Sequence, residues 1–206
     1  NVVDVVAWLA AVSALTTFIF AKILLDEELP KSFPLAMGLI LAGMLLVGHF
    51  RFYARSFVQT VFSGALFGFL AVLTKILFSH AGFWDGFFWS RMGNVLAAIV
   101  MLSFPFVHSQ IFRITRETPA KTGVLVVGNK VLAGTASLLI LYAISIGLVS
   151  IVNALASLQF VFVFVLILLF RKKIPDWFHH EFRSGHVRHK VLAMVFIVLG
   201  FFVLFT

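Results

Sequence analysis

Long apolar runs separated by short polar segments organise the whole chain. Seven runs cover residues 2–25, 33–50, 58–80, 87–107, 122–147, 148–170 and 191–206. Each is close to the roughly 20 apolar residues that an α-helix needs to cross a hydrocarbon layer of about 30 Å. None shows the shorter, alternating pattern of a membrane β-strand. The pattern therefore predicts an all-α membrane protein with seven transmembrane helices.

Composition and charge agree with this class. Apolar residues make up 62% of the 206 residues and charged residues 12%, with a mean hydropathy of +1.10. A water-soluble chain of this length could not bury so much apolar surface, so lipid must surround most of it. The net charge of +8 comes from Lys and Arg between the apolar runs, which indicates membrane orientation and not nucleic-acid binding. We expect no cofactor.

Two stretches carry the same pattern with opposite charge. "LLDEELP" at 24–30 and "LLFRKKIP" at 168–175 each place three charges, an aliphatic residue and a proline after an apolar run. A first repeat segment, "LAMGLILAG" at 35–43, follows the acidic stretch, and a second repeat segment, "LAMVFIVLG" at 192–200, follows the basic one. The two segments coincide at Leu, Ala, Met, Ile and Gly. The sequence therefore predicts an internal duplication.

The register of this duplication predicts an inverted repeat. Residues 58–206 would form a five-helix unit, residues 1–50 the last two helices of an equivalent unit, and residues 51–57 a linker. We expect three further helices upstream of Asn1. A unit with an odd number of helices returns on the opposite side of the membrane, so the acidic and basic loops should face opposite compartments. Because Lys and Arg concentrate in cytoplasmic loops, we expect the basic loop to be cytoplasmic.

The chain resembles the EamA-type drug/metabolite transporter superfamily. "LLDEELP", "GLILAG" and "YAISIGLVSIVNALASLQFVFVFVLILL" carry the resemblance. It implies a ten-helix secondary transporter in the inner (cell) membrane, part of an inverted 5+5 repeat, that moves a small polar metabolite by alternating access through a central cavity. The charge bias reverses the family's usual placement of both termini in the cytoplasm. A non-transporting accessory protein and an integral-membrane lipid-modifying enzyme are the alternatives.

Polar residues within the apolar runs are the candidate substrate-binding groups. In 122–147 they form one helical face, and in 148–170 they form another. The candidates are Asn129, Lys130, Ser137, Asn153, Ser157 and Gln159. Lys130 would be the counter-charge of an anionic or zwitterionic substrate, and Asn153 would orient that substrate. Gln159 lies off its stripe. Hydrogen bonding between helices is the alternative role, above all for the Ser residues.

The remaining charged segments predict no chemistry. Lys22, Lys75 and Arg91 lie within about five residues of the predicted helix ends, so we expect them to extend to the membrane interface. The His-rich stretch 179–189 lacks the spacing of a zinc-protease helix, and no metal site is predicted. We expect the basic loop 171–190 to contact anionic lipid headgroups. No catalytic arrangement is present, so the chain is not predicted to be an enzyme.

Overall fold

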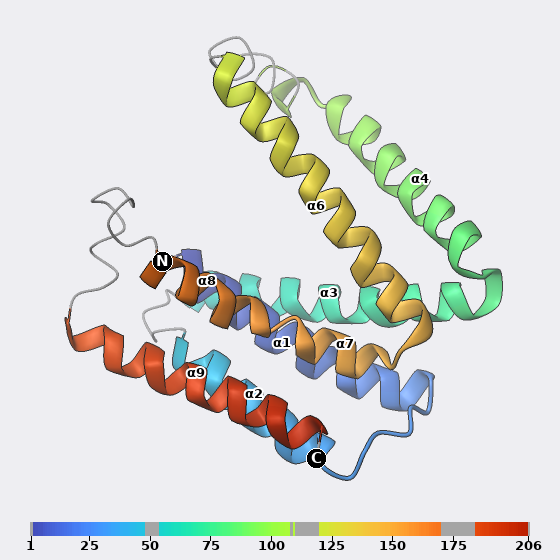
Figure 1. Cartoon of the computed structure of the whole chain (residues 1–206). Helices are drawn as coiled ribbons and strands as arrows, with labels where there is room; N and C mark the ends of the chain where they lie inside the picture. Colours follow the sequence, from blue (N-terminus) through green and yellow to red (C-terminus); the bar gives the residue numbers. More distant parts are fainter. Residues whose placement is uncertain (1, 48–53, 108, 110–119, 170–183, 206) are drawn as a thin grey trace. The chain divides into compact units, whose positions relative to one another are not determined.

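The computed structural model describes residues 2–47, 54–107, 109, 120–169 and 184–205, and within these ranges the chain forms helices and no strand. The helices are α1 (Val2–Leu24), α2 (Phe33–Val47), α3 (Ala54–Ala81), α4 (Phe83–Leu102), α6 (Ala120–Ile146), α7 (Val149–Leu155), α8 (Leu158–Leu169) and α9 (Ser184–Phe205) (Figure 1). The prediction of an all-α protein is therefore confirmed for the described part of the chain.

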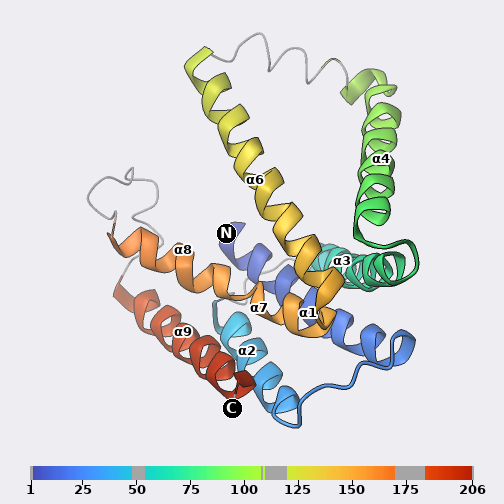
Figure 2. The same cartoon turned by 45° about the vertical axis from the view of Figure 1, so that its right-hand side comes forward.

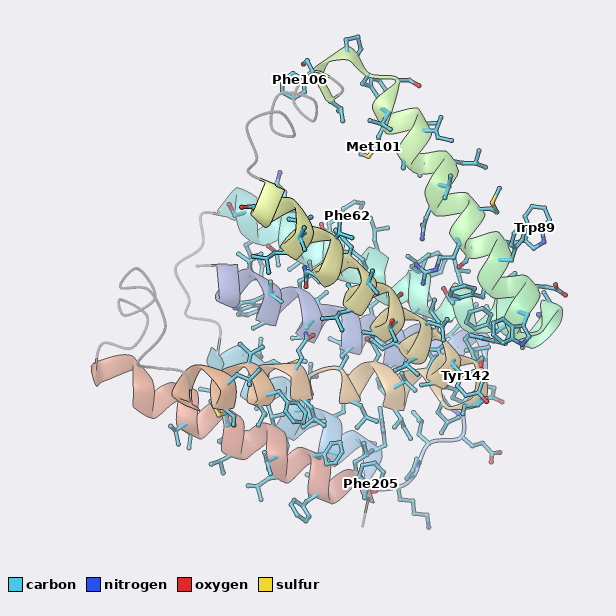
Figure 3. All side chains as sticks on the ribbon, turned by 45° about the horizontal axis from the view of Figure 1, so that its top comes forward. Phe62, Trp89, Met101, Phe106, Tyr142 and Phe205 are labelled. Carbon is cyan, nitrogen blue, oxygen red and sulfur yellow. The ribbon has the colours of Figure 1, made fainter. Side chains whose placement is uncertain are left out.

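Three helices are long and apolar enough to cross a membrane. They contain Val5–Leu24 in α1, Ser56–Ala81 in α3 and Thr122–Ile146 in α6. The apolar helices Phe33–Leu46 and Val191–Phe205 are shorter. Exposed aromatic side chains such as Phe62 on α3, Trp89 on α4 and Phe205 on α9 project from the ribbon (Figure 3). Length and composition therefore indicate a membrane protein.

The predicted single helix over 148–170 is wrong, because the chain breaks between α7 and α8. The Ser157 N–H donates to the Ala154 carbonyl at 3.1 Å, and the Gln159 N–H donates to the Ala156 carbonyl at 3.2 Å. These bonds span three residues and tighten the chain into a turn. Residues 154–160 contain no Gly or Pro. The sequence therefore carries no helix-breaking residue that would have predicted the break.

Two other predicted boundaries are also corrected. The segment 87–107 forms a helix that begins at Phe83 and ends at Leu102. Gly82, with φ of +74°, turns the chain immediately before it, a backbone conformation that glycine adopts without steric cost. The loop predicted at 171–190 is helical from Ser184 onward; its first part lies outside the described residues.

The chain divides into two compact units. Unit 1 contains Asn1–Leu73 and Leu148–Thr206, and unit 2 contains Thr74–Gly147. In unit 1, α1, α2, α7 and α9 share one apolar cluster whose largest fully buried side chains include Phe33, Ile40 and Met44. Burial of each such side chain contributes roughly 1.5–3 kcal/mol in water. Within a membrane, close packing and not water exclusion must hold these helices together.

Helices α2 and α9 lie side by side at very close approach (Figures 1 and 2). A Cβ atom added at Gly43 of α2 would lie 2.6 Å from Ile197 Cγ1 and 2.7 Å from the Ala193 carbonyl oxygen. Both distances are too short for a real carbon atom, so only glycine fits there. Gly43 therefore lets the two backbones touch, as small residues do between membrane helices.

The same contact recurs with the helices exchanged. A Cβ added at Gly200 of α9 would lie 2.8 Å from the Ala36 carbonyl oxygen and 2.8 Å from Ile40 Cγ1. When the two repeat segments are aligned, Gly200 is the counterpart of Gly43, and Ala36 and Ile40 are the counterparts of the two residues that face Gly43. The C-terminal half of each helix meets the N-terminal half of the other, so the pair is antiparallel.

A second close contact joins α1 to the part of α3 in unit 1. A Cβ added at Gly68 would lie 2.5 Å from the Ser13 carbonyl oxygen, and one added at Gly64 would lie 2.8 Å from the Leu9 carbonyl oxygen. Gly64 and Gly68 have the four-residue spacing that places both on one face of a helix. The described residues of unit 1 therefore include two backbone-to-backbone helix contacts, α2 with α9 and α1 with α3.

In unit 2, α4 contacts its neighbours through aromatic rings. Phe83 lies against Tyr142 of α6 with ring centroids 5.2 Å apart and an interplanar angle of 80°. A Cβ added at Gly86 would lie 2.6 Å from the Phe78 ring. The edge-to-face geometry of Phe83 and Tyr142 is one that aromatic pairs prefer. This pair fixes the first turn of α4 beside the last turns of α6.

We predict that Gly43→Ala destabilises the protein and Gly38→Ala does not. The added methyl at position 43 must displace α9, at a cost of about 1–3 kcal/mol. Position 38 lies on the same helix, and its Cβ would have no neighbour within 4 Å, so alanine there should stabilise by roughly 0.5–1 kcal/mol through helix propensity. Thermal unfolding in detergent measures both. Equal unfolding temperatures for the two variants would contradict the close contact.

Candidate functional site

Polar side chains from α1 and α7 meet inside unit 1, beside the backbone of α3. Asn153 Nδ2 of α7 lies 3.3 Å from both Ser13 O and Ser13 Oγ of α1, and it also donates to Thr17 Oγ1. The Thr17 hydroxyl lies 2.8 Å from Ser13 O and 3.2 Å from Gly68 O, so its single proton has two acceptors. We name these four residues the Asn153 junction.

Two further hydroxyls lie on the same face of the chain as Asn153. Ser150 and Ser157, at helical spacing from it, are both buried, and neither hydroxyl has a hydrogen-bond partner. An unpaired buried hydroxyl costs about 1–3 kcal/mol. Ser157 also lies at the break between α7 and α8. The predicted stripe of this segment therefore faces the interior, whereas Gln159 is exposed.

Glu27 of the acidic stretch is buried and bonds to the start of α7. Its Oε1 accepts a hydrogen bond from the Val149 N–H at 2.7 Å, and its Oε2 accepts one from the Ser150 N–H at 3.3 Å. The residue before α7 is Leu148, which offers no side-chain cap. A carboxylate satisfies these unpaired N–H groups and favours the positive end of the helix.

The sequence prediction missed this role of Glu27. It assigned the acidic stretch to membrane orientation alone. The only sequence signal was a helix start without Ser, Thr, Asp or Asn, which needs an acceptor from elsewhere in the chain. Because that acceptor is 122 residues away, no local pattern could identify it.

In unit 2, Lys75 has the complementary role at the end of α6. Its ammonium donates to the Ser145 carbonyl at 3.0 Å and to the Gly147 carbonyl at 2.8 Å. A cation at a helix C-terminus is favoured by the partial negative charge of the unpaired carbonyls. Lys75 was expected to extend to the interface, and the structure instead directs it to the backbone of another helix. Lys22 is exposed and pairs with Asp26 at 3.0 Å.

Arg91 lies farther from a helix end than the sequence suggested. Because α4 begins at Phe83, Arg91 is eight residues inside a 20-residue helix, or about 12 Å along its axis. Its Nη2 donates to the Ser137 hydroxyl of α6 at 2.7 Å. Its guanidinium carbon lies 5.0 Å from the centroid of the Phe87 ring. The expectation that Arg91 extends from a nearby helix end is therefore wrong.

The other two candidates on α6, Asn129 and Lys130, are exposed. Lys130 has no hydrogen-bond or ion-pair partner in the described part of the chain. It lies seven residues before Ser137, on the same face of α6 two turns away. Thus the structure joins Ser137 to Arg91 within unit 2 and Asn153 to Ser13 and Thr17 within unit 1.

Most of the basic segment 171–190, with its predicted headgroup contact, lies outside the described residues.

Comparison with known proteins gives no relative. No family model matches the chain, and no curated protein or solved structure matches it.

We predict that Glu27→Gln destabilises the protein by about 1–2 kcal/mol, because the amide offers one acceptor oxygen and no charge to the start of α7. Glu28→Gln is the matched control, since Glu28 is the adjacent acidic residue and is exposed. Thermal unfolding in detergent measures both. If the two variants unfold at the same temperature, Glu27 does not stabilise α7.

Proposed function

We propose that this protein is a multi-pass membrane transporter of the EamA type, which moves a small polar metabolite by alternating access about an inverted repeat. The observation that carries the proposal is the reciprocal contact of α2 and α9. Gly43 meets one helix as Gly200 meets the other, which is the relation that a two-fold axis between antiparallel helices produces. Inverted repeats related by such an axis in the membrane plane are common in secondary transporters.

The proposed topology has seven spans within residues 1–206. They are α1, α2, α3, α4, α6, α7 with α8, and α9. Together, α7 and α8 cover residues 149–169, which is long enough to cross about 30 Å. Residues 1–50 would close the first repeat and residues 58–206 would form the second, in the inner membrane with the basic loop in the cytoplasm.

The broken helix supports transport over a purely structural role. Transporters bind substrate and ions where a membrane helix is discontinuous, because the interrupted backbone offers free polar groups away from lipid. Here the break lies beside buried Ser157 and one turn after Asn153. A polar group inside an apolar helix is costly and is retained where it has a function.

Lys130 and Asn153 are the principal substrate-binding residues in this proposal. Lys130 would neutralise an anionic or zwitterionic substrate, because its ammonium is exposed and unpaired within the described residues. Asn153 uses its amide nitrogen in the Asn153 junction. Its carbonyl oxygen has no partner there, so it could accept a hydrogen bond from substrate. The further candidates are Asn129 and Ser137 in unit 2, and Ser157 and Gln159 in unit 1.

We predict that Lys130→Ala and Asn153→Ala reduce substrate uptake by about tenfold while the folded yield stays near that of the wild type. Loss of a hydrogen bond to a charged group costs about 1.5–3 kcal/mol, whereas a contact between membrane helices averages only about 0.6 kcal/mol. The measurement is initial uptake into proteoliposomes from a panel of labelled amino acids, sugars and carboxylates. Lys31→Ala, at an exposed position before α2, is the charge control.

Two outcomes would contradict this proposal. Wild-type protein that takes up no member of the panel would favour an accessory protein or a lipid-modifying enzyme. Normal uptake by both variants would leave transport intact and disprove the assigned binding residues.

A further inference from the structure

The geometry points to Arg91 as a binding site for an anionic group, a carboxylate or a phosphate, in unit 2. This inference rests on the proposed function only in that α4 crosses the membrane. Lys130 is an exposed cation on α6, whereas Arg91 of α4 contacts Ser137 and the Phe87 ring.

Most of the hydrogen-bonding capacity of Arg91 is unused. A guanidinium has five N–H donors, and among the described residues only one partner accepts from it, the Ser137 hydroxyl, which bonds to Nη2. The Nε atom is buried and has no hydrogen-bond partner. A buried charged donor without an acceptor costs more than 1–3 kcal/mol. A bound carboxylate or phosphate would accept from Nε and a terminal nitrogen together, as these groups do in bidentate pairs.

The charge of Arg91 also lacks a counter-ion. No carboxylate of the described residues forms an ion pair with it. Asp85 lies on the same helix, six residues earlier, without such a contact. A cation about 12 Å inside a membrane helix costs about 2.5–3.5 kcal/mol on insertion scales. The neutral Ser137 hydroxyl does not neutralise it, and a bound anion would.

Aromatic rings hold the guanidinium in one orientation. The guanidinium carbon of Arg91 lies 5.0 Å from the centroid of the Phe87 ring. The ring centroids of Phe87 and Phe83 are 5.8 Å apart. Phe83 is fixed in turn against Tyr142, which Figure 3 places at the end of α6. Arginine stacks on such faces because its charge is delocalised and weakly hydrated. The guanidinium of Arg91 is therefore already oriented to bind a planar carboxylate or a tetrahedral phosphate.

A purely structural role makes a different prediction. If Arg91 serves only to join α4 to α6 through Ser137 and Phe87, anions will not change its chemical accessibility. Phenylglyoxal tests this directly, because it modifies free guanidinium groups and crosses lipid. The full chain is placed in phosphatidylcholine nanodiscs, and modification of Arg91 is followed by peptide mass spectrometry. Phosphate, acetate and chloride are compared at equal ionic strength.

We expect phosphate or acetate to slow the modification of Arg91 by about tenfold relative to chloride, the factor expected for a charge-assisted bond. The other arginines of the chain are internal references. Ser137→Ala should retain the protection, because it removes only a competing acceptor. A second arm uses nanodiscs that contain phosphatidylglycerol: protection that appears only there assigns the site to a lipid headgroup, and protection in both assigns it to a soluble anion.

A thermal measurement complements the chemical one. Phosphate should raise the unfolding temperature of wild-type protein and of Lys31→Gln, but not of Arg91→Gln. If Arg91→Gln does not fold, the protection experiment on wild-type protein still decides. Modification of Arg91 that is unaffected by phosphate and acetate in both kinds of nanodisc would overturn the inference. Because this assay measures binding, it does not depend on whether the protein transports.

Discussion

The close antiparallel contact between α2 and α9 is the constraint on which the packing of unit 1 depends. Two glycines, Gly43 and Gly200, remove the side chains that would separate the helices. Lipid gives apolar helices no hydrophobic reason to associate, so contact at this range supplies the van der Waals energy that replaces it. Each glycine faces the counterpart of the residues that face the other, so the nine-residue pattern shared by the two segments provides both halves of the contact.

Charged side chains stabilise the ends of two helices. Glu27 bonds to the first N–H groups of α7 in unit 1, and Lys75 bonds to the last carbonyls of α6 in unit 2. Each charge has the sign that its helix end attracts. These residues therefore have structural partners, which separates them from Arg91 and Lys130, whose charges are not neutralised by any described residue. The candidate binding chemistry lies with the latter two.

The helical class could be predicted, because apolar length is a local property of the sequence. The nine-residue pattern shared by 35–43 and 192–200 is also local, but it did not predict that these two segments pack against each other. The start of α4 was misplaced because Trp84 and Asp85 resemble an interfacial loop, and this error hid the depth of Arg91. The break at Ser157 carries no Gly or Pro. The bond of Glu27 to α7 depends on chain folding across 122 residues, which no single-sequence pattern encodes.

Paired spin-label distances test the reciprocal contact most directly. The chain has no Cys, so cysteines can be placed at exposed positions of α2 and α9 alone: Gly38 with Phe202, and Leu45 with Val195. The two-fold relation of the repeat segments exchanges one pair for the other. The account predicts the same distance for both pairs in double electron–electron resonance on membrane-reconstituted protein. Distances that differ by more than about one helical turn, about 5.4 Å, would contradict it.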